Sequence, residues 1–294
     1  MNPPARLAMV IGVLLFAGSS LLVAVAQRPD ERDSVDKIAK LGGRFRVDPE
    51  KPNNPVIEVD LRNTGVTDAD LQLLKDLPDL RVLILGGTQG TKVTDKGLEH
   101  LKGSVNLQRL YLYGTPITDE GLVHLEGLTD LRLLHLVGTR VSTDGLKHLK
   151  GMTKLEQLDY YGIDDTGLSH LKALTSLKTL QLYRCIVTDA GLEHLGGLTN
   201  LQSLHFGSAQ ITDDGLKHLK KLTALRDLSL DAPPGHYGGG NPITDAGIEH
   251  IKGLTKLEIL NIRHTQVTNA GVRQILKELP QLKVEGRRSQ VPTE

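Results

Sequence analysis

The chain has 294 residues, of which 24% are charged and only 3% are aromatic, with 35 basic and 35 acidic side chains and no tryptophan. Because the charges balance, the composition argues against a nucleic-acid groove, which needs an excess of lysine and arginine on one face. The single cysteine, Cys185, excludes an intramolecular disulfide. What remains informative is how the chain repeats itself and where its few aromatic residues fall.

The N-terminus carries an uncharged run of twenty residues, 7–26, followed directly by a charged segment. The run is long enough for a membrane-spanning helix. It also has the form of a secretory signal, with an Ala-Val-Ala cleavage motif that ends at Ala26. Two interpretations of residues 1–26 therefore stay open, a cleaved signal peptide and a retained membrane anchor. Both predict export of the remaining chain to the periplasm, the cell surface or the medium, with no other membrane contact.

Residues 27–55 are predicted to form a charged linker and an N-terminal cap. A helix is expected over residues 34–41, with Ser34 as its N-cap and a Gly-Gly pair as its stop. Two strands, at 44–47 and 56–61, are expected to follow, joined by a turn rich in proline and asparagine. Together these elements are expected to cover the open apolar end of the segment that follows.

From residue 56 to residue 281 one sequence pattern recurs nine times, at steps of 22 to 32 residues. In each copy the apolar residues first alternate with a period of two, which predicts a strand. They then take a helical spacing after a threonine, serine or aspartate that can act as N-cap. Self-similarity at this period predicts stacked units that bury their apolar faces on one another. The copies, called repeats one to nine below, begin at Val56, Leu80, Leu107, Leu131, Leu155, Leu177, Leu201, Leu225 and Leu257.

Each predicted helix starts with a short common motif. An aspartate usually follows the N-cap residue, which we attribute to the favourable interaction of a carboxylate with the helix macrodipole. A glycine stands two residues further on, although glycine costs up to about 1 kcal/mol inside a helix. We therefore expect close packing against the neighbouring repeat to require the glycines, such as Gly97, Gly121, Gly145, Gly191 and Gly215.

The full pattern, L-x-x-L-x-L-x-x-T-x-[IV]-T-D-x-G-L-x-H-L, resembles the leucine-rich repeat and covers about three quarters of the chain. It is most similar to the ribonuclease-inhibitor-like, cysteine-containing variety found in F-box-type receptors and in bacterial surface proteins. The resemblance implies an α/β solenoid shaped as a horseshoe, with a parallel sheet on the concave face and helices on the convex face. The chain lacks the disulfide-bonded caps usual in secreted animal members, which favours a bacterial exported form. Residues 282–294 are expected to add a C-terminal cap strand and a polar tail.

The outward-facing strand positions depart most from the repeat pattern. Four of the six tyrosines project there, and tyrosine supplies a large contact area with a polar tip. We therefore predict a non-enzymatic protein whose concave sheet binds another protein or a peptide. An insertion in repeat eight, at residues 231–242, is expected to form part of the rim. The predicted contact residues are Tyr111, Tyr113, His135, Asp159, Tyr161, Gln181, Tyr183, Arg184 and His205.

Three alternatives stay open. A substrate receptor resembling the F-box leucine-rich repeat proteins of ubiquitin ligases fits the repeat type, but no F-box-like helical domain precedes the repeats. Carbohydrate binding at the cell surface suits a tyrosine platform, whereas the absence of tryptophan is unfavourable. A small hydrolase that uses His135 and Asp159 is disfavoured because no nucleophile stands with them at a credible spacing.

Two further features are interpreted as structural. Seven histidines hold one helical position, but packed helices lie roughly 8–10 Å apart, whereas nitrogen ligands lie about 2.1 Å from a zinc ion. We therefore expect no metal site and no cofactor. Cys185 holds a turn position that in this repeat family forms a buried ladder bonded to neighbouring backbone, so we interpret its thiol as structural. Elsewhere that position is held by Thr64, Thr88, Thr115, Thr139 and Thr265.

Overall fold

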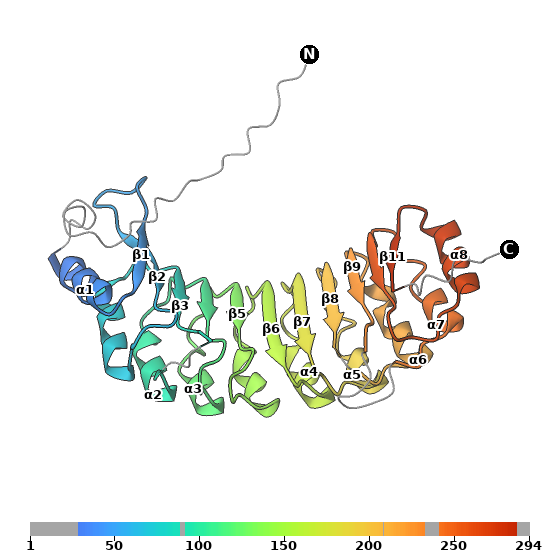
Figure 1. The fold of residues 1–294 in the computed structure, drawn as a ribbon, viewed down its shortest axis with the longest axis horizontal. Coiled ribbons are helices and arrows are strands. Elements are labelled where there is room, and N and C mark those ends of the chain that lie inside the picture. Colours follow the sequence, from blue (N-terminus) through green and yellow to red (C-terminus); the bar gives the residue numbers. More distant parts are fainter. Residues whose placement is uncertain (1–28, 89–91, 208, 233–240, 287–294) are drawn as a thin grey trace, which may run out of the picture.

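The computed structural model describes residues 29–88, 92–207, 209–232 and 241–286. In this part of the chain eleven strands form one sheet in sequence order, β1 to β11. Strand β1 pairs with β2 in antiparallel orientation, and every later pair of neighbours is parallel. Figure 1 shows an arc with the strands side by side along its inner side and the short helices α2 to α7 along its outer side. The predicted fold class, an α/β solenoid, is confirmed.

The regular elements follow the predicted alternation of strand and helix. The strands are β1 (Arg44–Val47), β2 (Val56–Asp60), β3 (Val82–Ile84), β4 (Arg109–Tyr111), β5 (Leu133–His135), β6 (Gln157–Tyr161), β7 (Thr179–Tyr183), β8 (Ser203–Phe206), β9 (Asp227–Ser229), β10 (Ile259–Asn261) and β11 (Lys283–Glu285). The α-helices are α1 (Pro29–Lys40), α2 (Asp95–Leu98), α3 (Asp119–Val123), α4 (Asp165–Leu171), α5 (Asp189–Glu193), α6 (Asp213–Leu216), α7 (Asp245–Glu249) and α8 (Asn269–Glu278). Short 3₁₀-helices complete or replace them at η2 (Asp68–Asp76), η3 (Glu99–Leu101), η4 (Asp144–Leu149) and η5 (Lys217–Lys221).

The N-terminal cap differs from its prediction in one respect. Helix α1 begins at Pro29, five residues before the predicted start, so the assignment of Ser34 as N-cap is wrong. Proline is favoured at the first helical position, and acidic residues there complement the macrodipole, which explains the earlier start. Ser34 is instead fully buried, and its hydroxyl donates to the Asp76 carboxylate at 2.7 Å. The residue therefore fastens α1 to the first repeat. The helix ends as predicted, with Gly42 at a φ of +83°.

A continuous row of leucines forms the core between sheet and helices. The second residue of each parallel strand from β3 to β10 points inward and is at most 1% exposed. Further leucines from the helices and turns close the layer from the outer side. Removing one such side chain, as in Leu180→Ala, is expected to cost about 2–5 kcal/mol, because neighbours on both sides hold the cavity open. These residues are Leu83, Leu110, Leu134, Leu158, Leu180, Leu204, Leu228 and Leu260.

A ladder of aspartates joins the helix starts of consecutive repeats. The carboxylate of each aspartate accepts two hydrogen bonds from the N-cap residue of the following repeat, one from its backbone N–H and one from its hydroxyl. The donor–acceptor distances lie between 2.5 and 2.8 Å at seven of the eight junctions. The pairs are Asp68–Thr94, Asp95–Thr118, Asp119–Ser142, Asp165–Thr188, Asp189–Thr212, Asp213–Thr244 and Asp245–Thr268.

At one of these aspartates, Asp245, the hydrogen bonds favour the ionised carboxylate. At Asp245 burial opposes ionisation, but hydrogen bonds from Thr268 and from the Gly271 backbone outweigh it and lower the pKa of the carboxyl. Charge-assisted hydrogen bonds of this kind each contribute about 1.5–3 kcal/mol where they are sheltered from water. From the sequence, the recurrence of these aspartates was explained only by their favourable interaction with the helix macrodipole. Their larger structural role is to bond each repeat to the next one.

The recurring glycines make room for the same carboxylates. At these seven junctions, a Cβ atom added at the glycine would lie 2.2 to 2.6 Å from the Oδ1 atom of the preceding repeat's aspartate. Real Cβ atoms do not approach an oxygen so closely, and the aspartate cannot withdraw without breaking its two bonds. The expectation that packing against the neighbouring repeat requires the glycines is therefore confirmed, and the contacting group is a carboxylate.

The eighth junction, between repeats four and five, reverses the polarity of the ladder. Repeat four has Thr143 where seven other repeats have aspartate, and repeat five has Asp164 where the other repeats have threonine or serine. The Thr143 hydroxyl now donates to the Asp164 carboxylate across the junction, at 3.2 Å. The other oxygen of Asp164 accepts from the Gly167 N–H at 2.8 Å and caps helix α4. One cross-repeat hydrogen bond thus replaces two.

Both ends of the ladder carry altered residues. In repeat one, Asp70 occupies the glycine position, and its carboxylate accepts from the Thr67 N–H at 2.8 Å and from the Thr67 hydroxyl at 2.6 Å. It fills the place that a preceding repeat's aspartate would take. In repeat nine, Asn269 replaces the aspartate that would face a following repeat. The ladder therefore begins and ends within the nine repeats.

Some predicted features lie outside the described residues. These are the apolar run 7–26, most of the insertion at 231–242, and the tail from residue 287. Within the residues that are described, no helix has the length and apolar character needed to cross a membrane.

The reversed junction predicts strong coupling between Thr143 and Asp164. Thr143→Asp alone brings two carboxylates together and should lower the free energy of unfolding by about 1–3 kcal/mol, whereas Asp164→Thr alone removes the helix cap carboxylate. The double variant recreates the Asp-to-Thr arrangement of the other junctions and should recover most of the loss. Urea denaturation of the four proteins measures the coupling. Additive effects of the two changes would contradict the ladder.

Candidate functional site

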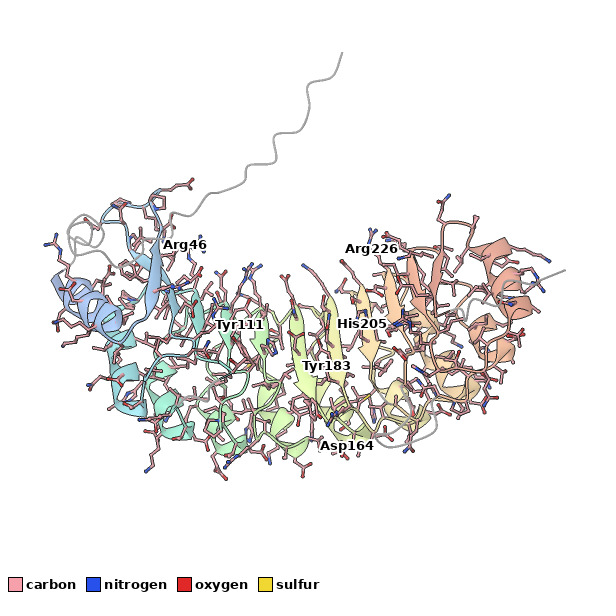
Figure 2. The ribbon with its side chains drawn as sticks, viewed as in Figure 1. Arg46, Tyr111, Asp164, Tyr183, His205 and Arg226 are labelled. Carbon is pink, nitrogen blue, oxygen red and sulfur yellow. The ribbon has the colours of Figure 1, made fainter. Side chains whose placement is uncertain are left out.

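The register of the sheet brings the predicted contact residues together. On its exposed side Tyr111, His135, Asp159, Gln181 and His205 occupy directly opposed positions on the five consecutive strands β4 to β8. Neighbouring strands lie about 4.8 Å apart, so these side chains form one row. Figure 2 shows Tyr111 and His205 at the same level of the sheet, with Tyr183 nearer the helices. The nine predicted residues are called the concave patch: Tyr111, Tyr113, His135, Asp159, Tyr161, Gln181, Tyr183, Arg184 and His205.

His135 lies at the centre of an aromatic group. Its ring centroid is 5.2 Å from that of Tyr113 and 6.3 Å from that of Tyr111, and both ring pairs are tilted. On its other side its Nδ1 atom lies 3.7 Å from the Asp159 carboxylate. The two tyrosines shield the imidazole from water, and burial lowers the pKa of His135, although the negative charge of Asp159 acts in the opposite direction.

Asp159 is the most enclosed charged group of the patch, with 8% of its surface exposed. Burial raises the pKa of its carboxyl, while His135 and a hydrogen bond from the Gln157 amide, at 3.1 Å, act to lower it. Asp159 was predicted from the sequence as a contact residue, but Gln157 was not predicted as its hydrogen-bond partner. Gln157 occupies the outward-facing position two residues before Asp159 on the same strand. Because that spacing puts both side chains on one face of the sheet, it could have indicated the contact from the sequence.

His205 does not join His135 and Asp159. Its Nε2 atom lies 2.8 Å from an Asp227 oxygen on the next strand and 3.3 Å from the Ser203 hydroxyl. Serine, histidine and aspartate resemble a catalytic triad, but both partners contact the same ring nitrogen. In a triad, one nitrogen receives the serine proton while the carboxylate holds the other. This cluster therefore lacks the geometry needed to activate a nucleophile.

Tyr161 and Tyr183 form the exposed end of the patch. They are directly opposed on β6 and β7, and their exposed fractions are 40% and 44%. The Tyr183 hydroxyl donates to the Gln181 side chain at 2.7 Å, which fixes the orientation of the ring. Tyr160, the residue before Tyr161 on β6, points to the opposite face of the sheet. It is only 2% exposed, and its hydroxyl donates to the Val141 carbonyl at 2.8 Å. The predicted alternation of inward and outward tyrosines is confirmed.

Arg184 follows Tyr183 in an unusual backbone conformation, with a φ of +46°. In repeats three to five glycine holds this position, with φ values from +69° to +80°. Left-handed backbone at a residue other than glycine costs roughly 1–2 kcal/mol, and such residues concentrate at functional sites. The guanidinium carbon lies 5.5 Å from the centroid of the Tyr161 ring, in cation–π geometry.

Sequence reasoning missed Ile186, which is 42% exposed beside Tyr183 and Arg184. The signal was present in the repeat alignment. Repeats four, seven and nine have Arg140, Gln210 and Gln266 at this position, and each donates its backbone N–H to the preceding repeat, as Ile186 does. A large apolar side chain there is a departure from the pattern of the repeat.

The opposite edge of the sheet, where the strands begin, is charged but internally paired. Glu156 accepts hydrogen bonds from Arg132 at 3.3 Å and from Lys178 at 2.8 Å. Arg226, at the upper edge in Figure 2, pairs with Glu258. These cations already have carboxylate partners, which distinguishes them from Arg184.

A separate depression of about 240 Å³ lies at the N-terminal end of the same face, lined mainly by polar residues and by the ring of Tyr113. One of its two arginines, Arg62, donates to both oxygens of Asp60, to Oδ1 at 3.0 Å and to Oδ2 at 2.7 Å. Its charge is therefore already matched inside the protein. The lining residues are Gly42, Arg44, Asp60, Arg62, Asn63 and Tyr113.

Three of the seven aligned helical histidines make separate contacts with acidic side chains. His148 Nδ1 lies 2.6 Å from Glu126, His124 lies 3.6 Å from Glu99, and the remaining measured contact, at His170, is longer. Across the described residues, no three histidine, cysteine or acidic side chains lie close enough together to hold a metal ion.

Cys185 is fully buried, and burial raises the pKa of its thiol to about 11. A thiol with so little thiolate at neutral pH is a weak nucleophile. Its sulfur lies 3.5 Å from the Gly207 carbonyl of the next repeat. The threonines differ from the expectation, because Thr64, Thr115 and their equivalents donate to a carbonyl of their own repeat, three residues earlier. Thr88 is exposed and does not fit the buried position.

The contact between His135 and Asp159 predicts how the pKa of His135 responds to a substitution. Asp159→Asn removes the charge that favours the protonated imidazole, so it should lower the pKa of His135 further. The unfolded chain then binds this proton more tightly than the folded chain does. The free energy of unfolding should therefore rise with pH between the lowered pKa and about 6.5. NMR titration of the imidazole signals measures the shift, and a raised or unchanged value would contradict the contact.

His264, paired with Asp231 at 2.8 Å near the far end of the sheet, is the control for this titration. Its imidazole signals should be the same in the wild type and in the Asp159→Asn protein.

Comparison with known proteins agrees with the geometry. A family model described as Leucine Rich repeat matches residues 197–220 and 253–276. Among solved structures, internalin C2 from Listeria monocytogenes matches 84% of this chain and 96% of its own, with a TM-score of 0.58 and 22% identity. Internalin F from the same organism matches 91% of this chain and 97% of its own, with a TM-score of 0.32 and 19% identity. Curated protein sequences give no match. Two segments of the chain thus match the leucine-rich repeat model, and the chain shares its solenoid fold with internalin C2.

Proposed function

We propose that the chain is an exported, non-enzymatic recognition protein that binds another protein or a peptide through the concave patch. The observation that carries the proposal is the pair Tyr161 and Tyr183, side by side and exposed on a rigid sheet. Exposed neighbouring tyrosines, stacked under a cation, form the kind of cluster that dominates binding energy at protein interfaces. The assignment of the repeats to the ribonuclease-inhibitor-like variety rests on the sequence pattern and is part of the same proposal.

The dimensions of the patch suit an extended peptide or a protein surface. Five strands at a spacing of about 4.8 Å span roughly 20 Å, which matches about six residues of extended chain at ~3.3 Å each. The side chains on this face are held by internal contacts, including Tyr183 with Gln181 and Asp159 with Gln157. A surface ordered before binding loses little conformational entropy when a partner arrives.

The patch offers poor support for the enzymatic alternative. The His135–Asp159 pair lacks a neighbouring nucleophile, and Ser203, His205 and Asp227 meet at a single ring nitrogen. The thiol of Cys185 is buried. Of the binding alternatives, helix α1 packs on the first repeat as part of the cap, which gives no separate support to an adaptor-binding role of the F-box kind. Carbohydrate binding remains a different outcome of the experiment below.

The tyrosine pair predicts a specific loss of binding. Tyr161→Ala and Tyr183→Ala should each weaken partner binding by about 1–3 kcal/mol and leave folding nearly unchanged, because both rings face solvent in the free protein. A pull-down from the cell envelope with residues 27–294 identifies the partner, and calorimetry measures the affinities. Lys147→Ala and Glu193→Ala, which are exposed on the helical side, are the controls and should bind like the wild type.

Two outcomes would count against the concave patch. One is a loss of binding in the helical-side variants while the tyrosine variants bind normally. The other is retention on glycans without any bound protein, which would favour the carbohydrate alternative.

Export is proposed from residues 7–26, which lie outside the described residues. A fusion of residues 1–35 to a reporter that is active only outside the cytoplasm should give a signal. If the run is a cleaved signal, N-terminal sequencing of the mature protein should start at Gln27; a retained anchor leaves the full-length chain in the membrane. A cytoplasmic, full-length product would refute export in both forms.

A further inference from the structure

Exposed apolar side chains gather at one point of the rim, where the strands β6 and β7 end. In the described part of the chain five large hydrophobic residues are exposed, and three of them, Tyr161, Tyr183 and Ile186, come from repeats five and six, with the two tyrosines directly opposed on β6 and β7. Arg184 lies among them in the sequence and stacks on Tyr161. These four residues are called the rim cluster.

Two irregularities of the chain expose the rim cluster. Repeat five lacks two residues after Gly162, so it has no equivalent of Thr139 and Arg140 to continue the stack of turns toward repeat six. Ile186 keeps its backbone hydrogen bond to Ile163 of repeat five, while its side chain is 42% exposed. On the other side, the position beside Tyr183 on the next repeat is held by Gly207, which has no side chain to cover the ring.

The positive charge of the rim cluster, on Arg184, is not paired with a carboxylate of the described residues. Glu156 and Glu258 pair with the cations at the opposite edge of the sheet. By contrast, no carboxylate of the described residues forms an ion pair with Arg184, which contacts the face of the Tyr161 ring. A guanidinium stacked in this way presents its N–H groups at its edges, where a carboxylate can accept two of them. Asn63 and His264 hold the equivalent turn position with φ values of +55° and +57°, and Arg184 is the residue that places a guanidinium there, on the Tyr161 ring.

From this arrangement we infer that the rim cluster takes a partner segment in which an acidic residue stands next to a large apolar residue. The carboxylate pairs with Arg184, and the apolar side chain packs on Ile186 and the Tyr183 ring. Within the patch, Asp159 lies one strand away from Tyr183, but it is only 8% exposed and its carboxylate contacts His135 and Gln157. The inference rests on the proposed function and specifies the chemistry of its partner.

The test is selection from a random peptide display library against the full-length chain, immobilised in detergent. Peptides that bind in a Tyr161- and Tyr183-dependent manner should be enriched in aspartate or glutamate adjacent to leucine, isoleucine or phenylalanine. Arg184→Gly, which restores the residue of repeats three to five and relieves the positive φ, should weaken these peptides about tenfold or more. Ile186→Gln, the residue of repeats seven and nine, should weaken them as well. Arg140→Gln is the matched control and should bind normally.

The outcomes separate this inference from the proposed function. Tyrosine-dependent peptides without an acidic preference, or with full affinity for the Arg184→Gly protein, would overturn the rim assignment and leave the concave patch standing. If no selected peptide depends on the tyrosines, both the proposed function and the inference are contradicted. Thermal unfolding of each variant, followed by circular dichroism, checks that the changes in binding do not come from loss of the fold.

Discussion

The contact on which the rest of the structure depends is the pair of hydrogen bonds from an N-cap residue to the preceding repeat's aspartate. It joins one helix start to the next along the outer side, while the leucines fill the space between helices and sheet. Apolar packing alone tolerates small slips between neighbours, because dispersion contacts are individually weak and lack direction. Two directed bonds to one carboxylate, with a glycine held against it, fix the offset between repeats. That offset in turn sets the spacing of side chains on the opposite face.

The arrangement of side chains in the concave patch therefore depends on the aspartate hydrogen bonds on the opposite, helical side of the molecule. Tyr161 and Tyr183 are opposed because β6 and β7 are in register, and their repeats are joined through Asp165 and Thr188. The repeats before them are joined more loosely, by the single bond between Thr143 and Asp164. The weakest junction of the ladder thus lies beside the most exposed part of the binding face.

Much of the fold and of the arrangement of the concave patch could be predicted from the sequence. A period-two pattern followed by a helical one gave the sheet, and counting along each copy gave the register of the nine patch residues. Contacts that cross between repeats were harder to predict. Within one copy an aspartate after an N-cap looks like a partner for the macrodipole, and only the stacked structure reveals that it reaches the next threonine. For the same reason Asp227 was missed as the partner of His205, and the polar consensus at the position of Ile186 was not compared between copies.

The altered residues at the ends of the ladder bear on how copies of the protein meet. A solenoid whose two ends match the contacts between its own repeats can join end to end and extend into a fibre, since such a contact does not close on itself. Here Asp70 already occupies the anion position at the first repeat, and Asn269 presents no carboxylate at the last. Helix α1 and strand β11 add a further cover at each end. Two copies that meet head to tail therefore do not find the pairing of aspartate with N-cap residue that interior repeats offer one another, so the ladder does not continue from one copy into the next.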